Sequence, residues 1–440
     1  YLPPPTAQLR HWGHFIKRPV TPVDIGQGPY ATVKVEDESG RAVPAQIVDG
    51  KLFPNGYRLK VQFVAESVPG CGLRTYYVTP EESGSAGSDG IVVRDTTIET
   101  PLLKVVVDAK TGHLLRIYDK RQRRDVLGKN TRANVLRLCM EAPHGMTGWV
   151  IGPVNSVEDL DKAESVQVVE QGPVRAVIQV ERKWDRSTFT QRIIVYKDLP
   201  RVDFELDVRW FQLGNHEVGV PMLRVAFPLN VTNGRFSCDT PFATVERPTT
   251  GQEVPAQKWT DLSGPNGGAA LLNNSKYGHR CEGKTLEMTL LRSSYDPDLY
   301  PDQGPHHIRY SLFPHAGSWD EAAVDLEGTS FNFPLLAIEA TPSEQGDLAS
   351  GTSFLTLNPG NLLLSAIKRA EDGASLVVRF YESQGRKSHA LLRFNRAVKC
   401  VTRVNLLEEP LDGVPDATLS GKKVMVPVKP HEIVSLRVDF

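Results

Sequence analysis

The chain has 440 residues, 40% of them hydrophobic. This length allows several hydrophobic cores and predicts two or three domains. Lys and Arg number 51 and Asp and Glu number 52, giving a net charge of −1. No excess of positive charge is therefore available for a phosphate backbone, which argues against nucleic acid as a partner. No run of about 18 apolar residues occurs, so no membrane-spanning helix is predicted.

The cysteines are odd in number, far apart, and without a C-x-x-C pair. They are Cys71, Cys139, Cys238, Cys281 and Cys400. This pattern argues against a disulfide framework and favours a reducing, cytoplasmic compartment. The chain begins at Tyr1 without a methionine, and its first residues do not resemble a secretory signal. A proteolytic fragment, a processed chain and a recombinant piece remain open.

Residues 1–90 are predicted to form a small β domain that ends in a linker. One expected strand contains Val33 and Val35. Two further strands are expected at 57–64 and 74–78. Residues 80–90 are small and polar, with nothing to bury, which is typical of a linker between domains.

Residues 91–345 have an almost purely β pattern and are predicted to form the second domain. The expected strands are 103–107, 114–118, 174–182, 189–196, 202–210, 269–273, 286–291 and a strand after Asp302. In the strand 202–210, apolar residues alternate strictly with charged ones. This alternation predicts one buried face and one solvated face, so Asp203, Glu205 and Asp207 are interpreted as surface groups.

One helix is predicted near the end of this domain. Ser318 and Glu321 have the spacing of a capping box, and Gly328 could end the helix ten residues later. We expect such a short helix to pack on the edge of the sheet.

Residues 346–440 are predicted to form a third, smaller β-sandwich. Its expected strands are 362–368, 375–381, 390–394, 401–407 and 433–438. The fold class predicted for the whole chain is therefore all-β and antiparallel.

The chain lacks the common motifs of catalytic and metal sites. It has no H-x-D pair, no H-E-x-x-H, no G-x-x-x-x-G-K-[ST] and no G-x-S-x-G. We therefore predict no catalytic and no metal-ligating residue within this chain.

Residues 300–315 stand out because they place polar groups at the end of a predicted strand. Pro301 and Gly304 bracket Asp302 and Gln303, which predicts a turn, and alternating apolar residues follow from 308 onwards. His306 and His307 would point to opposite faces of that strand and so could not bind one metal. The turn is either an ordinary polar surface turn or part of a binding site.

Some side chains of the chain are of the types that bind sugars: carboxylates and amides for hydroxyl groups, aromatic rings for C–H surfaces. The candidates are Asp302, Gln303, His306, Arg247, Lys258 and Trp259. The composition alone does not show that they converge.

An ordered set of segments resembles the C-terminal half of the family 38 α-mannosidases, in their cytosolic, vacuolar and bacterial branch. The segments are 112–120, 170–176, 190–196, 245–248, 254–262, 270–278, 302–304, 364–372 and 405–408. The resemblance covers most of the chain from about Val33 onwards. It implies a large antiparallel super-sandwich, similar to galactose mutarotases, flanked by smaller β-sandwiches.

The resemblance also implies a division of labour. In that family the zinc ligands and the nucleophilic aspartate lie on an N-terminal α/β barrel, and retaining hydrolysis needs two carboxyl groups about 5 Å apart. This chain is therefore expected to hold no zinc, to be inactive alone, and to support a barrel that binds and cleaves mannosides. Its surface towards the barrel should be unusually apolar.

By the same resemblance, Asp302, Gln303, Gly304 and His306 help to close the sugar site. The sequence departs from the family pattern at Pro305, His307 and Ile308. A free-standing carbohydrate-binding module and a mutarotase-like sugar epimerase are the alternatives. Homo-oligomer formation and the mannoside linkage stay open.

Overall fold

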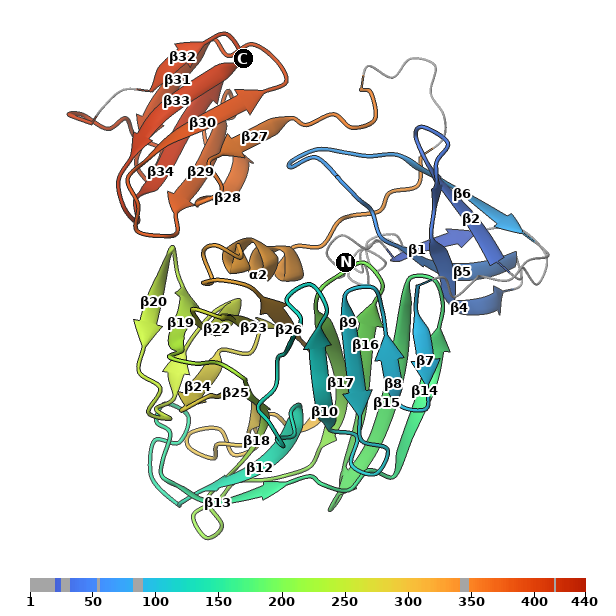
Figure 1. Ribbon diagram of the computed structural model, residues 1–440. Helices are drawn as coiled ribbons and strands as arrows, with labels where there is room; N and C mark the ends of the chain where they lie inside the picture. The colour runs from blue at the N-terminus through green and yellow to red at the C-terminus, as the bar shows by residue number, and fades with distance from the viewer. Residues whose placement is uncertain (1–19, 25–31, 54–55, 82–89, 341–347, 415–416) are drawn as a thin grey trace.

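The computed structural model describes residues 20–24, 32–53, 56–81, 90–340, 348–414 and 417–440. Within these residues the chain is built from antiparallel strands, with the α-helix α2 (Val324–Asn332) near the middle of the molecule (Figure 1). None of the described helical segments is long and apolar enough to cross a membrane.

Two three-stranded sheets form a small sandwich at the start of the chain. Their strand orders are β1(Val20–Asp24)-β5(Gly56–Phe63)-β4(Ala45–Phe53) and β3(Ala42–Val43)-β2(Thr32–Asp37)-β6(Tyr76–Glu81). Alternate apolar residues such as Val33, Val35, Val61 and Phe63 point between the sheets and form the core. The strands expected here are confirmed, the last one beginning at Tyr76. Residues 82–89 of the expected linker lie outside the described residues.

The largest unit is a super-sandwich whose back layer is a nine-stranded sheet. In spatial order its strands are β14(Ser165–Gln171), β15(Arg175–Trp184), β16(Ser187–Tyr196), β17(Val202–Trp210), β26(Gly304–His315), β23(Gly267–Asn274), β22(Trp259–Gly264), β19(Arg235–Thr240) and β20(Ala243–Arg247). The predicted meander β15–β16–β17 is confirmed, and β26 extends it on the far side of β17.

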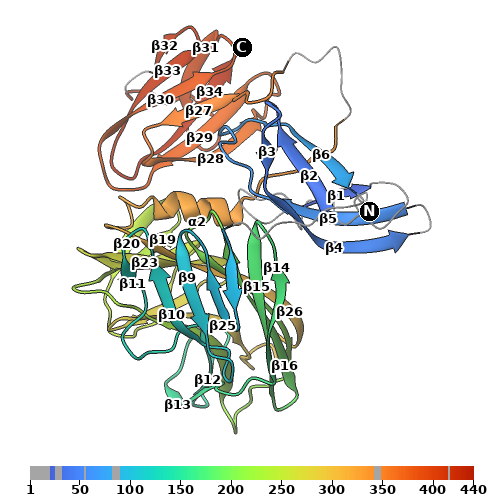
Figure 2. The ribbon, with the colours of Figure 1, turned by 45° about the vertical axis from the view of Figure 1, so that its right-hand side comes forward.

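Two further sheets cover one face of this layer (Figure 2). One is six-stranded: β13(Val154–Asp159), β12(Val135–Glu141), β18(Val220–Pro228), β25(Thr285–Arg292), β24(Gly278–Glu282) and β21(Val254–Pro255). The other is five-stranded: β11(Arg124–Asp125), β10(Leu114–Asp119), β9(Leu103–Val107), β8(Thr97–Glu99) and β7(Val92–Arg94). A single apolar core, which includes Phe204, Leu206, Phe227 and Tyr310, fills the space between the layers.

The outer face of β17 is only partly solvated, so its predicted pattern is wrong at one end. Asp203 is 2% exposed, accepting a hydrogen bond of 2.9 Å from Arg201 Nε and one of 2.7 Å from Ser311 Oγ. Arg201 in turn pairs with Glu327 of α2, because the helix covers this end of the sheet. Asp207, further along the strand, reaches solvent as predicted.

The helix differs from its prediction in both position and packing. Residues 319–323 form turns, and α2 runs from Val324 to Asn332, with Gly328 in its interior. It packs on the face of β22 and β23 through Val324 and Phe331, and not on a sheet edge. Gly328 allows this approach, since a Cβ added there would lie 2.5 Å from Cδ1 of buried Trp259.

Two four-stranded sheets form the C-terminal sandwich. Their orders are β27(Leu355–Asn358)-β30(Ser388–Phe394)-β33(Lys423–Val428)-β32(Thr418–Ser420) and β28(Leu362–Arg369)-β29(Leu376–Glu382)-β34(Ile433–Asp439)-β31(Cys400–Val404). The five expected strands are confirmed, while β27, β32 and β33 were not predicted. Asp325 of α2 accepts a hydrogen bond of 2.7 Å from Ser383 Oγ, which joins this sandwich to the super-sandwich. The predicted class, an antiparallel super-sandwich flanked by smaller β-sandwiches, is confirmed.

The contact between α2 and Trp259 can be tested by the change Gly328→Ala. Alanine gains about 1 kcal/mol of helix propensity, but overpacking a buried side chain typically costs about 1–3 kcal/mol. We expect net destabilisation, measured by urea unfolding. Gly360→Ala is the control, because nothing lies within 4 Å of its added Cβ. A Gly328→Ala protein more stable than wild type would contradict this packing.

Candidate functional site

The candidate site lies where strand ends from two layers meet, at the end of the super-sandwich away from α2 (Figure 1). In the nine-stranded sheet, Trp210 at the end of β17 pairs with Gly304 at the start of β26. In the six-stranded sheet, Glu141 pairs with Val220 and Arg292 pairs with Met222. Three connections therefore meet here, residues 142–153, 211–219 and 293–303, which we call the rim loops.

The predicted turn before β26 is present. Asp302 is exposed, has φ of +57°, and accepts a 3.2 Å hydrogen bond from the Arg292 backbone N–H. Gln303 donates through its side-chain amide to the carbonyl of Gln212. Gly304 has φ of +108° with no atom close to where a Cβ would be, so its backbone conformation, not lack of space, favours glycine.

The two histidines of β26 have different partners, as the alternation along the strand predicts. His306 is half-buried, and its Nε2 lies 2.7 Å from the carbonyl oxygen of Asp302. Because a carbonyl oxygen only accepts, Nε2 carries the hydrogen, and Nδ1 of a neutral His306 is an acceptor. His307 Nδ1 instead lies 2.6 Å from Asp207 Oδ1, and this hydrogen bond holds the pKa of Asp207 below its usual value.

A cationic side chain from another loop lies near Asp302. Lys276 follows β23 and is half-buried. Burial lowers the pKa of Lys276, and the charge of Asp302 opposes this effect. Carboxylate, amide, imidazole and ammonium groups therefore gather at this end of the sheet, and these groups suit hydrogen bonding to sugar hydroxyls.

The other sugar-binding candidates do not join this group. Trp259 is fully buried and packs against Trp319 and α2, so its ring cannot stack on a ligand. Lys258 forms an ion pair of 2.9 Å with Asp239. Arg247 belongs to the β19–β20 hairpin, where it pairs with Phe236. Of the six candidate residue types, Trp259 is therefore unavailable for contact with a ligand.

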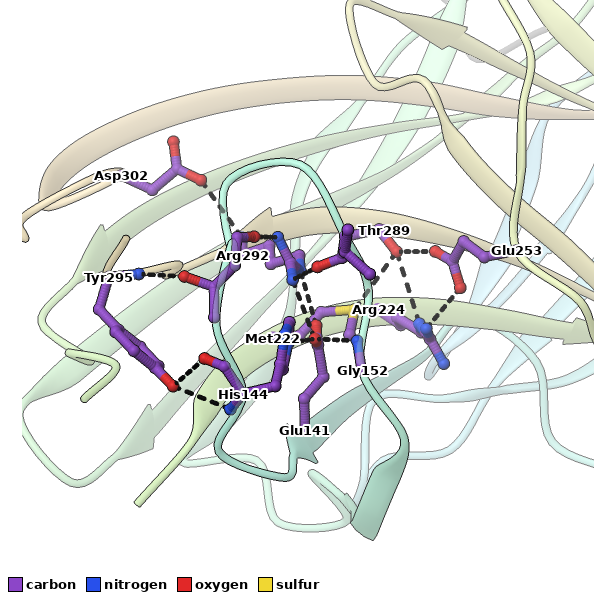
Figure 3. A network of polar contacts seen from close by, with 12 residues as sticks. Glu141, His144, Gly152, Met222, Arg224, Glu253, Thr289, Arg292, Tyr295 and Asp302 are labelled. Carbon is purple, nitrogen blue, oxygen red and sulfur yellow. Dashed lines mark hydrogen bonds and ion pairs between the residues drawn. The ribbon is translucent and has the colours of Figure 1, made fainter. Parts of the chain in front are cut away.

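A buried ion pair supports the rim loops from below (Figure 3). Arg292 Nε lies 2.6 Å from Glu141 Oε1 and its Nη2 lies 2.9 Å from Oε2, a bidentate arrangement. The side chain of Glu141 is fully buried and that of Arg292 is 15% exposed. Burial alone would raise the pKa of Glu141, but the hydrogen bonds from Arg292 and from the Gly152 N–H hold it below the ordinary value.

The same arginine fixes the backbone of the first rim loop. Its guanidinium donates to the carbonyls of Thr147 and Val150, and the Gly152 N–H donates to Glu141 Oε2 at 2.8 Å. The backbone N–H of Arg292 donates to the carboxylate of Asp302. One residue therefore connects the 142–153 loop with the turn that carries the predicted site.

The third rim loop completes the network. Tyr295 OH donates to the carbonyl of His144 at 2.6 Å and accepts from the His144 N–H at 3.0 Å. Thr147 Oγ1 accepts the N–H groups of Tyr295 and Asp296, both at 2.9 Å. Asp296 Oδ2 accepts the Met146 N–H at 2.7 Å. These bonds pair backbone groups of the first and third rim loops and fix the loop conformations.

Sequence reasoning missed Glu141, Arg292 and Lys276. The first two are 151 residues apart, and neither stands in a motif. No group of three or more His, Cys, Asp and Glu side chains in the described part of the chain is placed to hold a metal ion.

Two family profiles match the sequence. The glycosyl hydrolases family 38 C-terminal domain matches residues 98–300, and the glycosyl hydrolases family 38 C-terminal beta sandwich domain matches 361–436. Alpha-mannosidase G of Dictyostelium discoideum is 29% identical over 366 residues, covering 78% of this chain and 32% of that protein. Human alpha-mannosidase 2C1 is 29% identical over 367 residues, covering 78% of this chain and 34% of that protein.

The chain thus spans about a third of the length of these curated relatives. Among solved structures, a protein of glycosyl hydrolase family 38 from Enterococcus faecalis superimposes with a TM-score of 0.75 at 19% identity. The match covers 96% of this chain and 57% of that chain. At this identity the superposition shows the shared fold.

The ion pair below the rim loops gives a stability prediction. Glu141→Gln leaves Arg292 charged and largely buried without a counter-ion, which should cost about 3–5 kcal/mol in urea unfolding at pH 7. The control is Glu246→Gln, which removes an exposed partner of Arg235 and should cost less than about 1 kcal/mol. Equal effects of the two changes would contradict the role of the buried pair.

The lowered pKa of Glu141 predicts how the free energy of unfolding depends on pH. A carboxyl with a depressed folded-state pKa contributes stability that is present above its unfolded value, about 4.5, and is lost as the pH falls through the folded value. The difference in the free energy of unfolding between wild type and Glu141→Gln, measured by urea unfolding, should therefore be constant from pH 7 to about 5 and shrink below pH 4.5.

Proposed function

The chain belongs to glycosyl hydrolase family 38, as its C-terminal β-sandwich region, and from this premise we propose that it is the supporting, non-catalytic portion of an α-mannosidase. The catalytic portion acts on terminal α-mannosides, and the rim of the super-sandwich helps to close its sugar site. The observation that carries the proposal is the turn at Asp302, an exposed polar group built on a firmly anchored strand end.

We assign the contact with sugar to Asp302, Gln303, Gly304 and His306. The Asp302 carboxylate can accept hydrogen bonds from hydroxyls, and His306 Nδ1 offers a second acceptor. The ammonium group of Lys276, whose pKa burial lowers and the charge of Asp302 raises, lies nearby and can donate hydrogen bonds to hydroxyls. Gly304 gives the turn its geometry. The family resemblance places zinc on the catalytic portion. Among the described residues of this chain, no group of three or more His, Cys, Asp and Glu side chains is placed to hold it.

The proposal extends to organisation and compartment. We propose domains at 1–90, 91–345 and 346–440, supported by the grouping of β1–β6, β7–β26 and β27–β34 into separate sandwiches. We propose a cytoplasmic protein, supported by five cysteines that are all free thiols.

A free-standing carbohydrate-binding module is the second candidate. This candidate is favoured because the hydrogen bonds that hold Asp302 and Gln303 in the turn are made within this chain. Calorimetry with mannose and α-mannosides separates the two: a supporting portion gives no saturable heat, and a module does.

The purified chain should not hydrolyse an aryl α-mannoside, with or without added Zn²⁺ or Co²⁺, because the proposal places the nucleophile elsewhere. Release of the aryl alcohol is followed by absorbance. Turnover that Asp302→Ala abolishes would refute the proposal.

In the complete α-mannosidase polypeptide, Asp302→Asn should lower kcat/KM about 10- to 100-fold, the effect of losing one or two hydrogen bonds to a charged acceptor. The control is His307→Gln, which changes the neighbouring imidazole on the other face of β26 and should leave kcat/KM unchanged. An Asp302→Asn enzyme with wild-type kcat/KM would exclude Asp302 from the sugar site.

A further inference from the structure

The C-terminal sandwich stands over α2 and meets the super-sandwich there (Figure 2). Three pairs of side chains connect the two units: Asp325 with Ser383, Asp320 with Arg386, and Phe242 with Tyr381. The apolar cores remain separate, since none of the cores formed by the described residues contains side chains from both units. The position of the sandwich on α2 therefore depends mainly on polar and ring contacts.

A second attachment, made largely by backbone groups, ties the start of the C-terminal sandwich to the N-terminal domain. The Leu73 N–H donates to the carbonyl of Thr352 at 3.0 Å, and the Phe354 N–H donates to the carbonyl of Cys71 at 3.0 Å. Backbone amides do not titrate near neutral pH. This attachment can therefore persist when the contact with α2 opens, and it provides a pivot for the sandwich.

Asp325 is a buried carboxyl group at the contact with α2. It lies in the first turn of the helix and is 2% exposed. Its oxygens accept hydrogen bonds from Ser383 Oγ at 2.7 Å and from the Leu326 N–H at 2.9 Å. In the described part of the chain, no Lys, Arg or His side chain pairs with it. A buried carboxylate without a cationic partner is costly, whereas the neutral acid is not.

The cations of the elements around Asp325 have other partners. The pairs are Arg386 with Asp320, Arg201 with Glu327, and Lys258 with Asp239. The remaining acids of these elements also have donors of their own: Glu321 accepts the Ser318 N–H, and Glu382 accepts the side-chain amide of Asn361. None of these groups supplies a counter-ion for Asp325.

Two further acidic groups lie close to Asp325. Burial raises the pKa of Asp325, the hydrogen bond from Ser383 opposes this, and the charge of Asp239 raises the pKa further. Burial likewise raises the pKa of Asp239, although Lys258 lowers it. Burial and the two carboxylates raise the pKa of Tyr381, so this phenol stays neutral. A negative charge on Asp325 is therefore unfavourable while the sandwich covers it.

We propose that the contact between the C-terminal sandwich and α2 is a pH-sensitive switch: the sandwich docks when Asp325 is protonated, and the contact opens when Asp325 is charged. This inference does not depend on the proposed function. The hydroxyl of Ser383 can donate to a carboxylate or accept from a carboxylic acid, so protonation keeps that hydrogen bond. Opening returns a charged Asp325 to water and removes the cost of its burial.

The direction of the pH effect follows from linkage. Because burial raises the pKa of Asp325 above its ordinary value of 3.8, the docked form binds the proton more tightly than the open form. Docking is strongest below about pH 3.8 and weakens as the pH rises through the pKa of the docked form. Asp239, with its raised pKa, acts in the same direction.

Hydroxyl-radical footprinting of the 440-residue chain tests the switch, because it measures the exposure of individual side chains. Tyr381 is 7% exposed and packs against Phe242 across the contact, whereas Tyr277 is 57% exposed on the loop after β23. Tyr277 is the matched control, since it reports any effect of pH on the chemistry itself. We expect the oxidation rate of Tyr381 relative to Tyr277 to rise at least about threefold from pH 4.5 to 7.5.

Two variants identify the titrating group. Asp325→Asn, which is neutral at every pH, should keep the ratio low at both pH values. Asp320→Asn removes the ion pair with Arg386 and should raise the ratio at both, with the pH dependence retained. Should Asp325→Asn fail to fold, Ser383→Ala replaces it, and its ratio should exceed that of the wild type at pH 7.5.

Three results would overturn the inference. The first is an equal ratio at both pH values in the wild-type chain. The second is an unchanged pH dependence in Asp325→Asn, or, where Ser383→Ala replaces it, a ratio at pH 7.5 equal to that of the wild type. The third is loss of the pH dependence in Asp320→Asn, which would assign the titration to the pair with Arg386.

Discussion

The rim depends on one bidentate ion pair between Glu141 and Arg292. The two residues end β12 and β25, the two neighbours of β18, so the pair spans the end of a three-strand ladder. A buried pair of this kind gives little net stability relative to an apolar replacement. Its structural effect is geometric: the same guanidinium binds two loop carbonyls, and the same residue's N–H binds Asp302. Compared with an apolar replacement, the pair therefore contributes fixed geometry more than net stability, although loss of one partner alone is costly.

The two ends of the nine-stranded sheet differ in what covers them. Near α2, both faces of β26 are buried, one against the main core and one against the helix. At the other end no helix of the described residues covers the sheet, and side chains such as His306 and His307 reach the surface. The helix therefore covers one end of these strands, and the side chains at the other end stay exposed.

Much of the fold could be predicted from local patterns, because strand period and turn residues are encoded by near neighbours in the sequence. Phe204 and Leu206 lie in the core as the alternation of β17 indicated. Asp203 could not be predicted as buried, since its burial depends on a helix more than a hundred residues later. Gly328 was misinterpreted for the same reason: its role depends on Trp259, not on the residues beside it. Of the candidate site, the turn at Asp302 is visible in the sequence, whereas Glu141 and Lys276 approach it only in the folded chain.

The polar turn at Asp302 and exposed apolar side chains such as Trp149 and Leu299 lie on the same set of rim loops. Under the proposed function, hydrogen bonds from sugar hydroxyls to Asp302 would be weak while water competes for the same carboxylate, and they would strengthen in a closed, dry site. Exposed side chains such as Trp149 and Leu299 cannot exclude water alone, but they can when a matching apolar surface covers them. A polar group that works only in a closed site and an apolar surface that closes it are therefore expected on the same loops. Arg292 keeps the two in fixed register, because it binds the backbone on either side of Trp149 through its side chain and Asp302 through its own N–H.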